Sequence, residues 1–224
     1  MAFRPELKLF NMRPIFITGI GTDIGKTVVS AIITEAVQAD YWKPVQAGFV
    51  DGTDSLRIQH LITNSVTRVH AEVYKLAMPA SPHLAAKNEG IQISVEAIGA
   101  AYKTLPGRNE FIVIEGAGGL MVPLNDEEFV PDLIKTLGAA VILVSRNYLG
   151  SINHSLLTAA VCRQYDINVL GWIFNGTYLD YEADICKWSG FPAICSIKEM
   201  PAVTRTEIAA VAQLIKPSLL KALE

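Results

Sequence analysis

A glycine-rich segment near the start of the chain combines residue types that can bind a phosphate chain. Residues 19–27 read Gly-Ile-Gly-Thr-Asp-Ile-Gly-Lys-Thr and directly follow the apolar run 14–18. Glycines let the backbone N–H groups approach an anion closely, and the start of the following helix adds a positive field. In this arrangement Lys26 lies on the β- and γ-phosphates, and the Thr27 hydroxyl lies on a magnesium ion. The spacing differs by one residue from G-x-x-x-x-G-K-T, because position 20 is Ile. The pattern nevertheless favours phosphate binding over an ordinary strand-to-helix turn.

A carboxylate follows a second apolar run. Glu115 ends the run 111–114 and precedes Gly-Ala-Gly-Gly at 116–119. A carboxylate at the end of a buried strand is placed like the second magnesium ligand or the water-holding residue of phosphate-loop enzymes. The glycines behind it permit close approach of the backbone to a substrate. A plain turn with a surface Glu is the alternative, and the expected place of this strand beside the glycine loop favours the functional interpretation.

Four further positions have two interpretations from the residues alone. Pro44 forces Lys43 into an extended conformation that suits a strand end aimed at a ligand, but Lys43 could equally be a solvated surface lysine. Asp54 could bind metal or cap a helix. Gly-Ser at 150–151 could offer free N–H groups to an anion or form an ordinary helix cap. Asn175 could contact a nucleotide base or shape a turn.

Apolar runs alternate with helical patterns along the chain, which predicts an α/β fold with a mostly parallel central sheet and helices on both faces. We expect strands at residues 15–18, 41–45, 111–115, 140–144, 169–175 and 193–196. We expect helices at residues 26–39, 54–63, 94–105, 130–137, 152–165, 180–189 and 206–216, and a loop at 79–82. In such open sheets the ligand lies at the carboxyl ends of the strands, which is where the residues above are expected.

Composition narrows the class of protein. Half of the 224 residues are hydrophobic and the formal net charge is −3 without a basic run, which argues against general nucleic-acid binding. The three cysteines have no C-x-x-C spacing and the four histidines no metal-ligand spacing, so we expect reduced thiols and no zinc site. No apolar run is long enough to span a membrane. We expect residues 1–13 to form an N-terminal extension and residues 14–224 a single domain.

Taken in order, these segments resemble the dethiobiotin synthetases, the family that closes the ureido ring in biotin synthesis. The resemblance runs from about residue 14 to Asn175. It rests on the loop 19–27, Trp-Lys-Pro-Val-Gln at 42–46, Asp54, Ser-Pro-His at 81–83, Glu-Gly-Ala-Gly-Gly at 115–119, Leu-Gly-Ser-Ile-Asn-His at 149–154 and Gly-Trp-x-x-Asn at 171–175. Seven motifs in one unbroken order are a specific match.

The resemblance implies a three-layer fold of the P-loop NTPase type and a particular reaction. The substrate would resemble 7,8-diaminononanoate, whose 7-amino group takes up CO2 as a carbamate. ATP would phosphorylate the carbamate to a carbamic–phosphoric anhydride, and the 8-amino group would then expel phosphate and close the cyclic urea. Magnesium is the implied cofactor and ATP the co-substrate. The implied setting is a cytoplasmic homodimer, with no nucleic-acid or membrane partner.

The resemblance also implies roles for individual residues. Lys43 and Lys26 would be catalytic, and magnesium would be held by Thr27, Asp54 and Glu115. The substrate carboxylate would be received by the backbone at 150–153 of the second subunit. The implied nucleotide-binding residues are Thr22, Asp23, Ile24, Gly25, Lys26, Thr27, Glu115 and Asn175. The implied substrate-binding residues are Lys43, Ala47, Gly118, Gly150, Ser151, Ile152 and Asn153.

The chain departs from the family pattern at three places. Ala47 stands where family members often carry Ser or Thr, so a hydroxyl contact to the substrate is lost. Asp23 stands where Glu is frequent. After Asn175 the Gly-x-x-Pro turn expected near the adenine pocket is replaced by Cys-Ser-Ile-Lys at 195–198, so no base-binding residue is assigned beyond Asn175.

Three other functions compete with this interpretation. A regulatory or partitioning ATPase of the deviant P-loop group would carry a signature lysine at the place of Gly21 and a C-terminal amphipathic membrane segment with a basic face. The amidating enzymes of corrinoid synthesis usually add a glutaminase domain, for which 224 residues leave no room. A binding-only module is disfavoured because Lys26, Asp54 and Glu115 together supply the parts for phosphoryl transfer.

Overall fold

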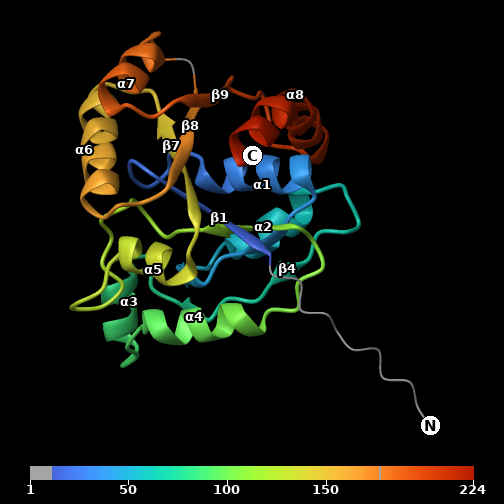
Figure 1. Ribbon diagram of the computed structural model, residues 1–224. Helices are drawn as coiled ribbons and strands as arrows, with labels where there is room; N and C mark the ends of the chain where they lie inside the picture. The colour runs from blue at the N-terminus through green and yellow to red at the C-terminus, as the bar shows by residue number, and fades with distance from the viewer. Residues whose placement is uncertain (1–11, 177) are drawn as a thin grey trace.

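A seven-stranded parallel sheet forms the centre of the computed structural model, which describes residues 12–176 and 178–224 (Figure 1). The spatial order of its strands is β4-β2-β6-β1-β7-β8-β9, and each neighbouring pair runs parallel. The strands are β1 (Arg13–Gly19), β2 (Asp40–Trp42), β4 (Val69–His70), β6 (Phe111–Glu115), β7 (Ala140–Arg146), β8 (Val169–Asn175) and β9 (Ala193–Ile197). The predicted α/β class with a parallel central sheet is confirmed.

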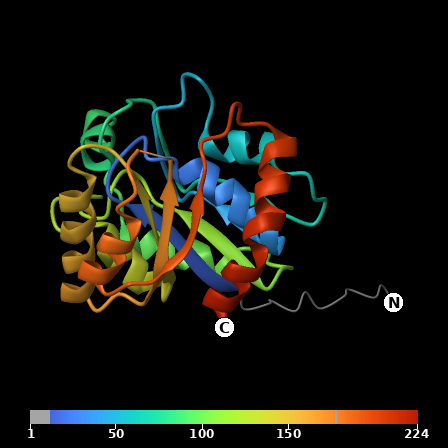
Figure 2. The same ribbon diagram turned by 90° about the horizontal axis from the view of Figure 1, so that it is seen from above.

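Helices cover both faces of this sheet, as Figure 2 shows from above. One face packs against α1 (Lys26–Val37), α2 (Asp54–Leu61) and α8 (Arg205–Leu223). The other packs against α4 (Val95–Thr104), α5 (Val130–Leu137), α6 (Ser151–Gln164) and α7 (Glu182–Ser189). The central strands contribute to both cores in alternation: Ile15 and Ile17 of β1 belong to the first core and Phe16 to the second. Burial on two sides explains why these strands read as continuous apolar runs.

The strand expected at residues 41–45 is wrong in its extent. β2 ends at Trp42, and a separate strand β3 (Val45–Ala47) pairs with β5 (Tyr74–Leu76) in a small parallel sheet. Pro44 lies between the two strands and has no N–H for a continuing ladder. Its carbonyl instead accepts hydrogen bonds from the Val73 and Tyr74 amides. Lys43 therefore lies just after β2 and outside the strand ladder, at the carboxyl edge of the sheet where ligands bind.

Other elements also differ from expectation, most of them by one or two residues at an end. α8 continues through Pro217 to Leu223 rather than ending at residue 216, and its last turns bury Leu219 and Leu223 in the core. The loop expected at 79–82 ends in a helix, α3 (Pro82–Asn88), because proline is well tolerated in a first helical turn. Short strands β4 and β5 were not expected.

The domain boundary expected at residue 14 lies slightly too late in the chain. Arg13 opens β1 and Met12 is buried in the core, so both belong to the packed body. The rest of the expected extension, residues 1–11, lies outside the described residues. The single-domain assignment stays a prediction.

The sheet order decides which chain segments meet at its carboxyl edge. β6 lies between β1 and β2, and Glu115 at the end of β6 is in register with Ile17 of β1. The glycine loop follows β1, Glu115 ends β6 and Lys43 follows β2, so the sheet brings these three together.

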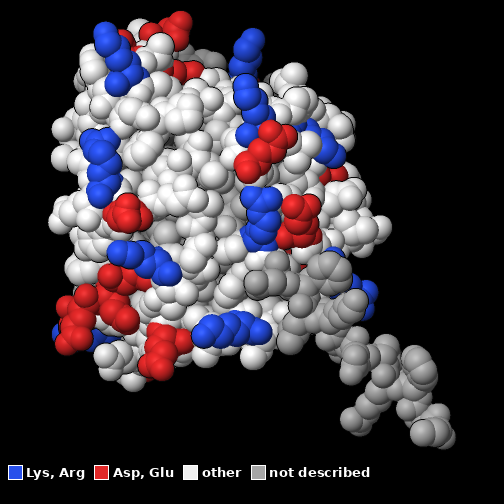
Figure 3. Space-filling view, viewed as in Figure 1, with Lys and Arg blue, Asp and Glu red and all other residues white. Residues whose placement is uncertain are grey.

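The charged side chains of the face drawn in Figure 3 form small groups of both signs rather than one continuous patch. Among the described helices, none has both the length and the apolar character that a bilayer crossing requires.

Candidate functional site

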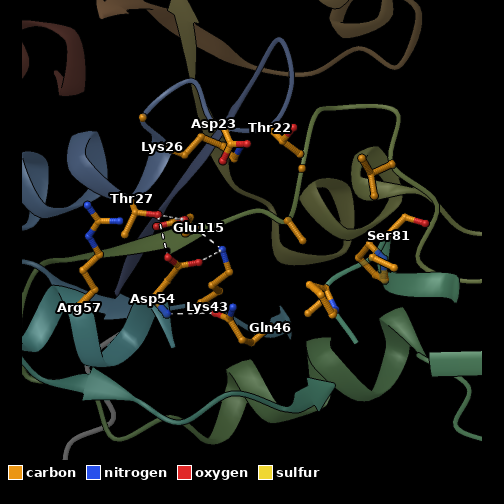
Figure 4. Close-up of a pocket in the computed structure, with 18 of the residues that line it drawn as sticks. Thr22, Asp23, Lys26, Thr27, Lys43, Gln46, Asp54, Arg57, Ser81 and Glu115 are labelled. Atoms are coloured by element: carbon orange, nitrogen blue, oxygen red, sulfur yellow. Dashed lines mark hydrogen bonds and ion pairs between the residues drawn. The ribbon is translucent and has the colours of Figure 1, made fainter. Parts of the chain in front are cut away.

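A cavity of about 750 Å³ opens at the carboxyl edge of the sheet (Figure 4). Its walls come from the glycine loop, the first turns of α1 and α2, the end of β6 and the segment around β3. The structure brings together ten of the residues that the sequence analysis assigned to the site. They are Thr22, Asp23, Gly25, Lys26, Thr27, Lys43, Ala47, Asp54, Glu115 and Gly118.

The glycine loop has the backbone conformation expected of an anion-binding turn. Gly25 has φ 92° and serves as the N-cap of α1, a conformation that favours glycine. A Cβ built on Gly25 would also lie 2.0 Å from Nδ2 of Asn175. That amide donates a 2.9 Å hydrogen bond to the Ile24 carbonyl, which ties the loop to the end of β8. A side chain at position 25 would therefore be strained by the positive φ and would crowd the Asn175 amide that holds the loop.

Lys26 turns back over the loop. Its Nζ donates a 2.6 Å hydrogen bond to the Gly21 carbonyl. An anion held by the loop would therefore lie close to the Lys26 ammonium. Burial lowers the pKa of Lys26 to about 8, because the nearby carboxylates, Glu115 first, only partly compensate for the lost hydration. Lys43 adds a repulsion in the same direction. An anionic ligand would relieve both effects.

Two carboxylates and one hydroxyl meet at the first turn of α1, where the glycine loop ends. The Thr27 Oγ1 lies 3.0 Å from Asp54 Oδ1 and 2.8 Å from Glu115 Oε1. A single hydroxyl proton can serve only one of these two acceptors at a time. The set therefore has surplus oxygen acceptors, and hard oxygen ligands are those that Mg²⁺ prefers. These residues fit a magnesium ion that keeps several waters and shares phosphate oxygens, since Mg²⁺ is commonly held by one or two carboxylates plus substrate phosphates.

Lys43 is enclosed by the same carboxylates. Its Nζ lies 2.7 Å from Asp54 Oδ2 and 3.0 Å from Glu115 Oε1, and its side chain is only 7% exposed. Burial alone would lower the pKa of Lys43, but Glu115 and Asp54 outweigh it and raise the pKa above the ordinary value. Burial likewise works against ionisation of Asp54, yet Lys43 holds the pKa of that carboxyl below its usual range. Lys43 is therefore a fixed cation inside the cavity, and the surface-lysine interpretation is wrong.

Tyr41 supports Glu115 from below, and the sequence analysis missed it. The fully buried phenol donates a 2.9 Å hydrogen bond to Glu115 Oε2. This contact leaves Oε1 facing Thr27 and Lys43. Burial, reinforced by Glu115, raises the pKa of Tyr41 well above its ordinary value, so the phenol remains a donor. An aromatic residue in an apolar strand gave no signal for this contact.

The start of α2 is capped so that Asp54 remains free to face the cavity. Thr53, not Asp54, is the N-cap, and its side chain accepts a 3.2 Å hydrogen bond from the Leu56 amide. The Asp54 amide donates to Gln46 Oε1, while Gln46 Nε2 donates to the Gly48 carbonyl. Gln46 thereby fixes the first turn of α2 against β3. It lay inside a recognised motif, but no role was assigned to it.

Six predicted site residues are not in the cavity wall. Ile24 is buried in the core beside the loop, and Asn175 contacts the loop backbone through the hydrogen bond to Ile24. The other four, Gly150, Ser151, Ile152 and Asn153, lie at the start of α6 after β7. Gly150 is the N-cap, and the Ser151 Oγ lies 2.7 Å from the Tyr181 hydroxyl and accepts from the Tyr148 amide. Ser151 is therefore not the cap residue of this helix.

Comparison with known protein families and curated relatives gives a consistent result. A family model described as an AAA domain matches residues 13–207. The ATP-dependent dethiobiotin synthetase BioD of Cytophaga hutchinsonii is 47% identical over 203 residues, which cover 90% of this chain and 96% of the relative. The protein of the same name from Christiangramia forsetii is 46% identical and covers 83% of this chain and 87% of the relative. That from Paramagnetospirillum magneticum is 36% identical, with 88% and 94% covered.

Solved structures similar to this chain share its fold at low sequence identity. The cell division ATPase MinD of Pyrococcus furiosus has a TM-score of 0.64 at 14% identity and covers 93% of this chain and 98% of its own. A ParA family ATPase from Chlorobium tepidum has a TM-score of 0.60 at 12% identity, with 96% and 99% covered. At such identities the likeness concerns the fold alone, and it agrees with the predicted P-loop NTPase architecture.

Proposed function

The chain belongs to the ATP-dependent dethiobiotin synthetases, and from this premise we propose that its cavity closes the ureido ring of dethiobiotin from 7,8-diaminononanoate, CO2 and ATP. The observation that carries the proposal is the position of Lys43, a buried cation held by two carboxylates in the same cavity as the Gly25-Lys26-Thr27 loop. A phosphate-binding loop alone would serve many ATPases. A second buried cation opposite it serves a second anionic reactant.

The reaction requires two anions to meet. The 7-amino group first adds to CO2 and loses a proton, which gives a carbamate. A carbamate oxygen then attacks the γ-phosphorus of ATP, and the bond to the bridging β–γ oxygen breaks to leave ADP. The 8-amino nitrogen attacks the carbonyl carbon of the resulting anhydride, phosphate departs, and the nitrogen loses a proton. Two unit like charges about 4 Å apart repel by about 4 kcal/mol at an effective dielectric constant of about 20, so the approach needs fixed cations.

The side chains of the cavity supply that field. We assign Lys26 to the β- and γ-phosphates, with Thr22 beside it, and Lys43 to the carbamate and the phosphoryl group in transit. Thr27, Asp54 and Glu115 would hold magnesium, which supplies further charge neutralisation on the phosphates. The hydrogen bonds around Lys43 support its role, because a cation fixed before the reaction needs no reorganisation when charge moves. No nucleophilic side chain is required.

The test is a product assay. The protein is incubated with the diamine, magnesium, ATP and ¹³C-labelled bicarbonate, and the cyclic urea is identified by mass spectrometry. We expect a labelled product, with one ADP and one phosphate released for each ring closed. Absence of product, together with ATP hydrolysis stimulated by another protein, would favour the switch ATPase instead.

The low pKa of Lys26 predicts a proton linkage. The pKa of Lys26 is about 8, and the negative charge of a bound phosphate would raise it. Nucleotide binding above pH 8 should therefore take up protons, and the apparent affinity should fall as the pH rises from 8 to 10. Calorimetry in two buffers of different ionisation enthalpy measures the uptake. Lys26→Arg, whose side chain does not titrate in this range, should abolish it. Equal uptake in both proteins would assign the proton to another group.

We also propose that the working form is a cytoplasmic homodimer in which the start of α6 from one subunit completes the cavity of the other. Two observations support this arrangement. Residues 150–153 lie outside the cavity of their own chain, and Leu149 beside them is 87% exposed. The three free thiols, Cys162, Cys186 and Cys195, support a reducing compartment.

A mixing experiment tests the shared site. Asn153→Asp places a negative charge where the substrate carboxylate would bind and is tolerated at a helix start. Lys43→Gln removes the cation from the cavity. In a mixed dimer one of the two cavities combines an intact Lys43 with an intact Asn153, so mixing two inactive variants should restore activity. If each chain holds a complete site, the mixture will be no more active than its parts.

A further inference from the structure

Arg57 is the third cationic side chain of the cavity wall, besides Lys26 and Lys43, and the sequence analysis did not assign it. It lies three residues after Asp54 on α2, so both side chains project from one side of the helix. Both line the cavity, together with Thr27 and Val28 of α1. Figure 4 shows the Arg57 side chain extending from α2 beside Asp54, with its guanidinium near Thr27 in this view.

The guanidinium has unused hydrogen-bonding capacity. Lys43 is committed to two carboxylates and Lys26 to the Gly21 carbonyl. Within residues 12–176 and 178–224, by contrast, no hydrogen bond or ion pair involves the Arg57 side chain. Its charge nevertheless acts on Asp54. Burial raises the pKa of that carboxyl and Lys43 lowers it, both more strongly than Arg57, which lowers it further. A planar fork of five donors facing a cavity suits a phosphate group.

The balance of charge on the cavity wall depends on Arg57. Without it, Lys26 and Lys43 are outnumbered by the three carboxylates of Asp23, Asp54 and Glu115. The charge of Lys43 is offset by its two carboxylate partners, whereas Arg57 has no such partner among the residues that the structure describes. Arg57 brings the ionised side chains of the wall to equal numbers of each sign.

The position of Arg57 along the wall indicates which phosphates it meets. Lys26 donates a hydrogen bond to the Gly21 carbonyl within the loop. The charges of Glu115, Lys43, Asp54 and Asp23 all act on the pKa of Lys26. Arg57 lines the cavity together with Thr27 and Val28 at the start of α1. The first-turn amides of α1 also face an anion at that end.

We propose that Arg57 binds the phosphates that remain in the diphosphate product, and thereby sets nucleotide affinity without taking part in phosphoryl transfer. This rests on the proposed function only in assuming that the cavity holds a nucleotide. Arg57 is a binding residue in this proposal, whereas Lys43 acts on the transferred group.

The test compares two ligands and three variants. Dissociation constants for MgADP and for a non-hydrolysable MgATP analogue are measured by calorimetry in wild type, Arg57→Gln, Arg57→Lys and Arg108→Gln. Arg108 is an exposed arginine that precedes β6 at the opposite edge of the sheet, so Arg108→Gln controls for net charge. We expect Arg57→Gln to weaken both ligands by a similar factor of about tenfold or more, as expected for a lost charge-assisted hydrogen bond. Arg57→Lys should lose less, and Arg108→Gln should bind as wild type does.

Other results overturn the proposal. Unchanged affinities in Arg57→Gln would show a solvated surface arginine. Weakening of the triphosphate analogue alone, or a fall in turnover at saturating ATP, would place Arg57 on the transferred phosphate. The proposed function fails separately: wild type that makes no cyclic urea but loses MgADP affinity on Arg57→Gln would leave the Arg57 assignment intact.

Discussion

Lys43→Gln is expected to lower turnover by about 10²- to 10³-fold, the usual cost of removing one preorganised donor from developing charge in a transition state. In the folded protein the Lys43 ammonium lies within 3.0 Å of carboxylates from two separate elements, so its position is set before any substrate arrives. Glutamine is of similar length but neutral, and it cannot offset the repulsion between a carbamate and a phosphate. The measurement is the rate of cyclic urea formation at saturating substrates.

Nucleotide affinity should survive this change. The glycine loop and Lys26 hold the phosphates, while removal of Lys43 leaves Asp54 and Glu115 with more unbalanced negative charge for a metal ion. We therefore expect MgADP to bind about as well as in wild type. Lys103→Gln, on the exposed side of α4, is the matched control for loss of one lysine. A steady-state rate equal to that of wild type would show that the role assigned to Lys43 is wrong.

Glu115→Gln is expected to raise the magnesium concentration required for half-maximal activity and to lower kcat/KM by at least about 100-fold, since an anionic oxygen ligand is replaced by a neutral amide. Glu115 is 1% exposed, and its carboxylate contacts Thr27, Lys43 and Tyr41. The amide also places a donor group where three donors already converge. The measurement is activity as a function of magnesium concentration, with thermal unfolding recorded alongside.

Two controls separate the metal site from general stability. Tyr41→Phe keeps the Glu115 charge and removes only the phenol that orients it, so the magnesium requirement should rise by about tenfold, less than in Glu115→Gln. Asp40→Asn removes another buried carboxylate, paired with His70 at 2.9 Å at the start of β2. It should lower the free energy of unfolding without changing the magnesium requirement. Equal magnesium curves for wild type and Glu115→Gln would remove Glu115 from the proposed metal site.

Local sequence patterns were sufficient for much of the fold because they report burial and backbone constraints directly. The apolar runs of β6 and β7 predicted central strands, and residues packed on both faces confirm them. The glycine loop and the start of α1 at Lys26 were correctly placed. The order of motifs identified the family, which the curated relatives confirm. The predicted bounds failed at Pro44, which lies between β2 and β3 and cannot donate to a continuing ladder, and at Pro217, where α8 continues and its last turns bury Leu219 and Leu223.

The tertiary structure alone decided how the site is assembled. The Asp54 carboxylate is not used to cap α2, because Thr53 is the N-cap and Gln46 accepts the hydrogen bond of the Asp54 amide. The carboxylate therefore faces the cavity. Tyr41 acquired a role through a carboxylate 74 positions away in the sequence. Such contacts depend on strand order and on side-chain direction, and neither has a local signature in the chain. The sequence specified which chemical groups are available, and the packing of β2, β6 and α2 determined which of them face one another.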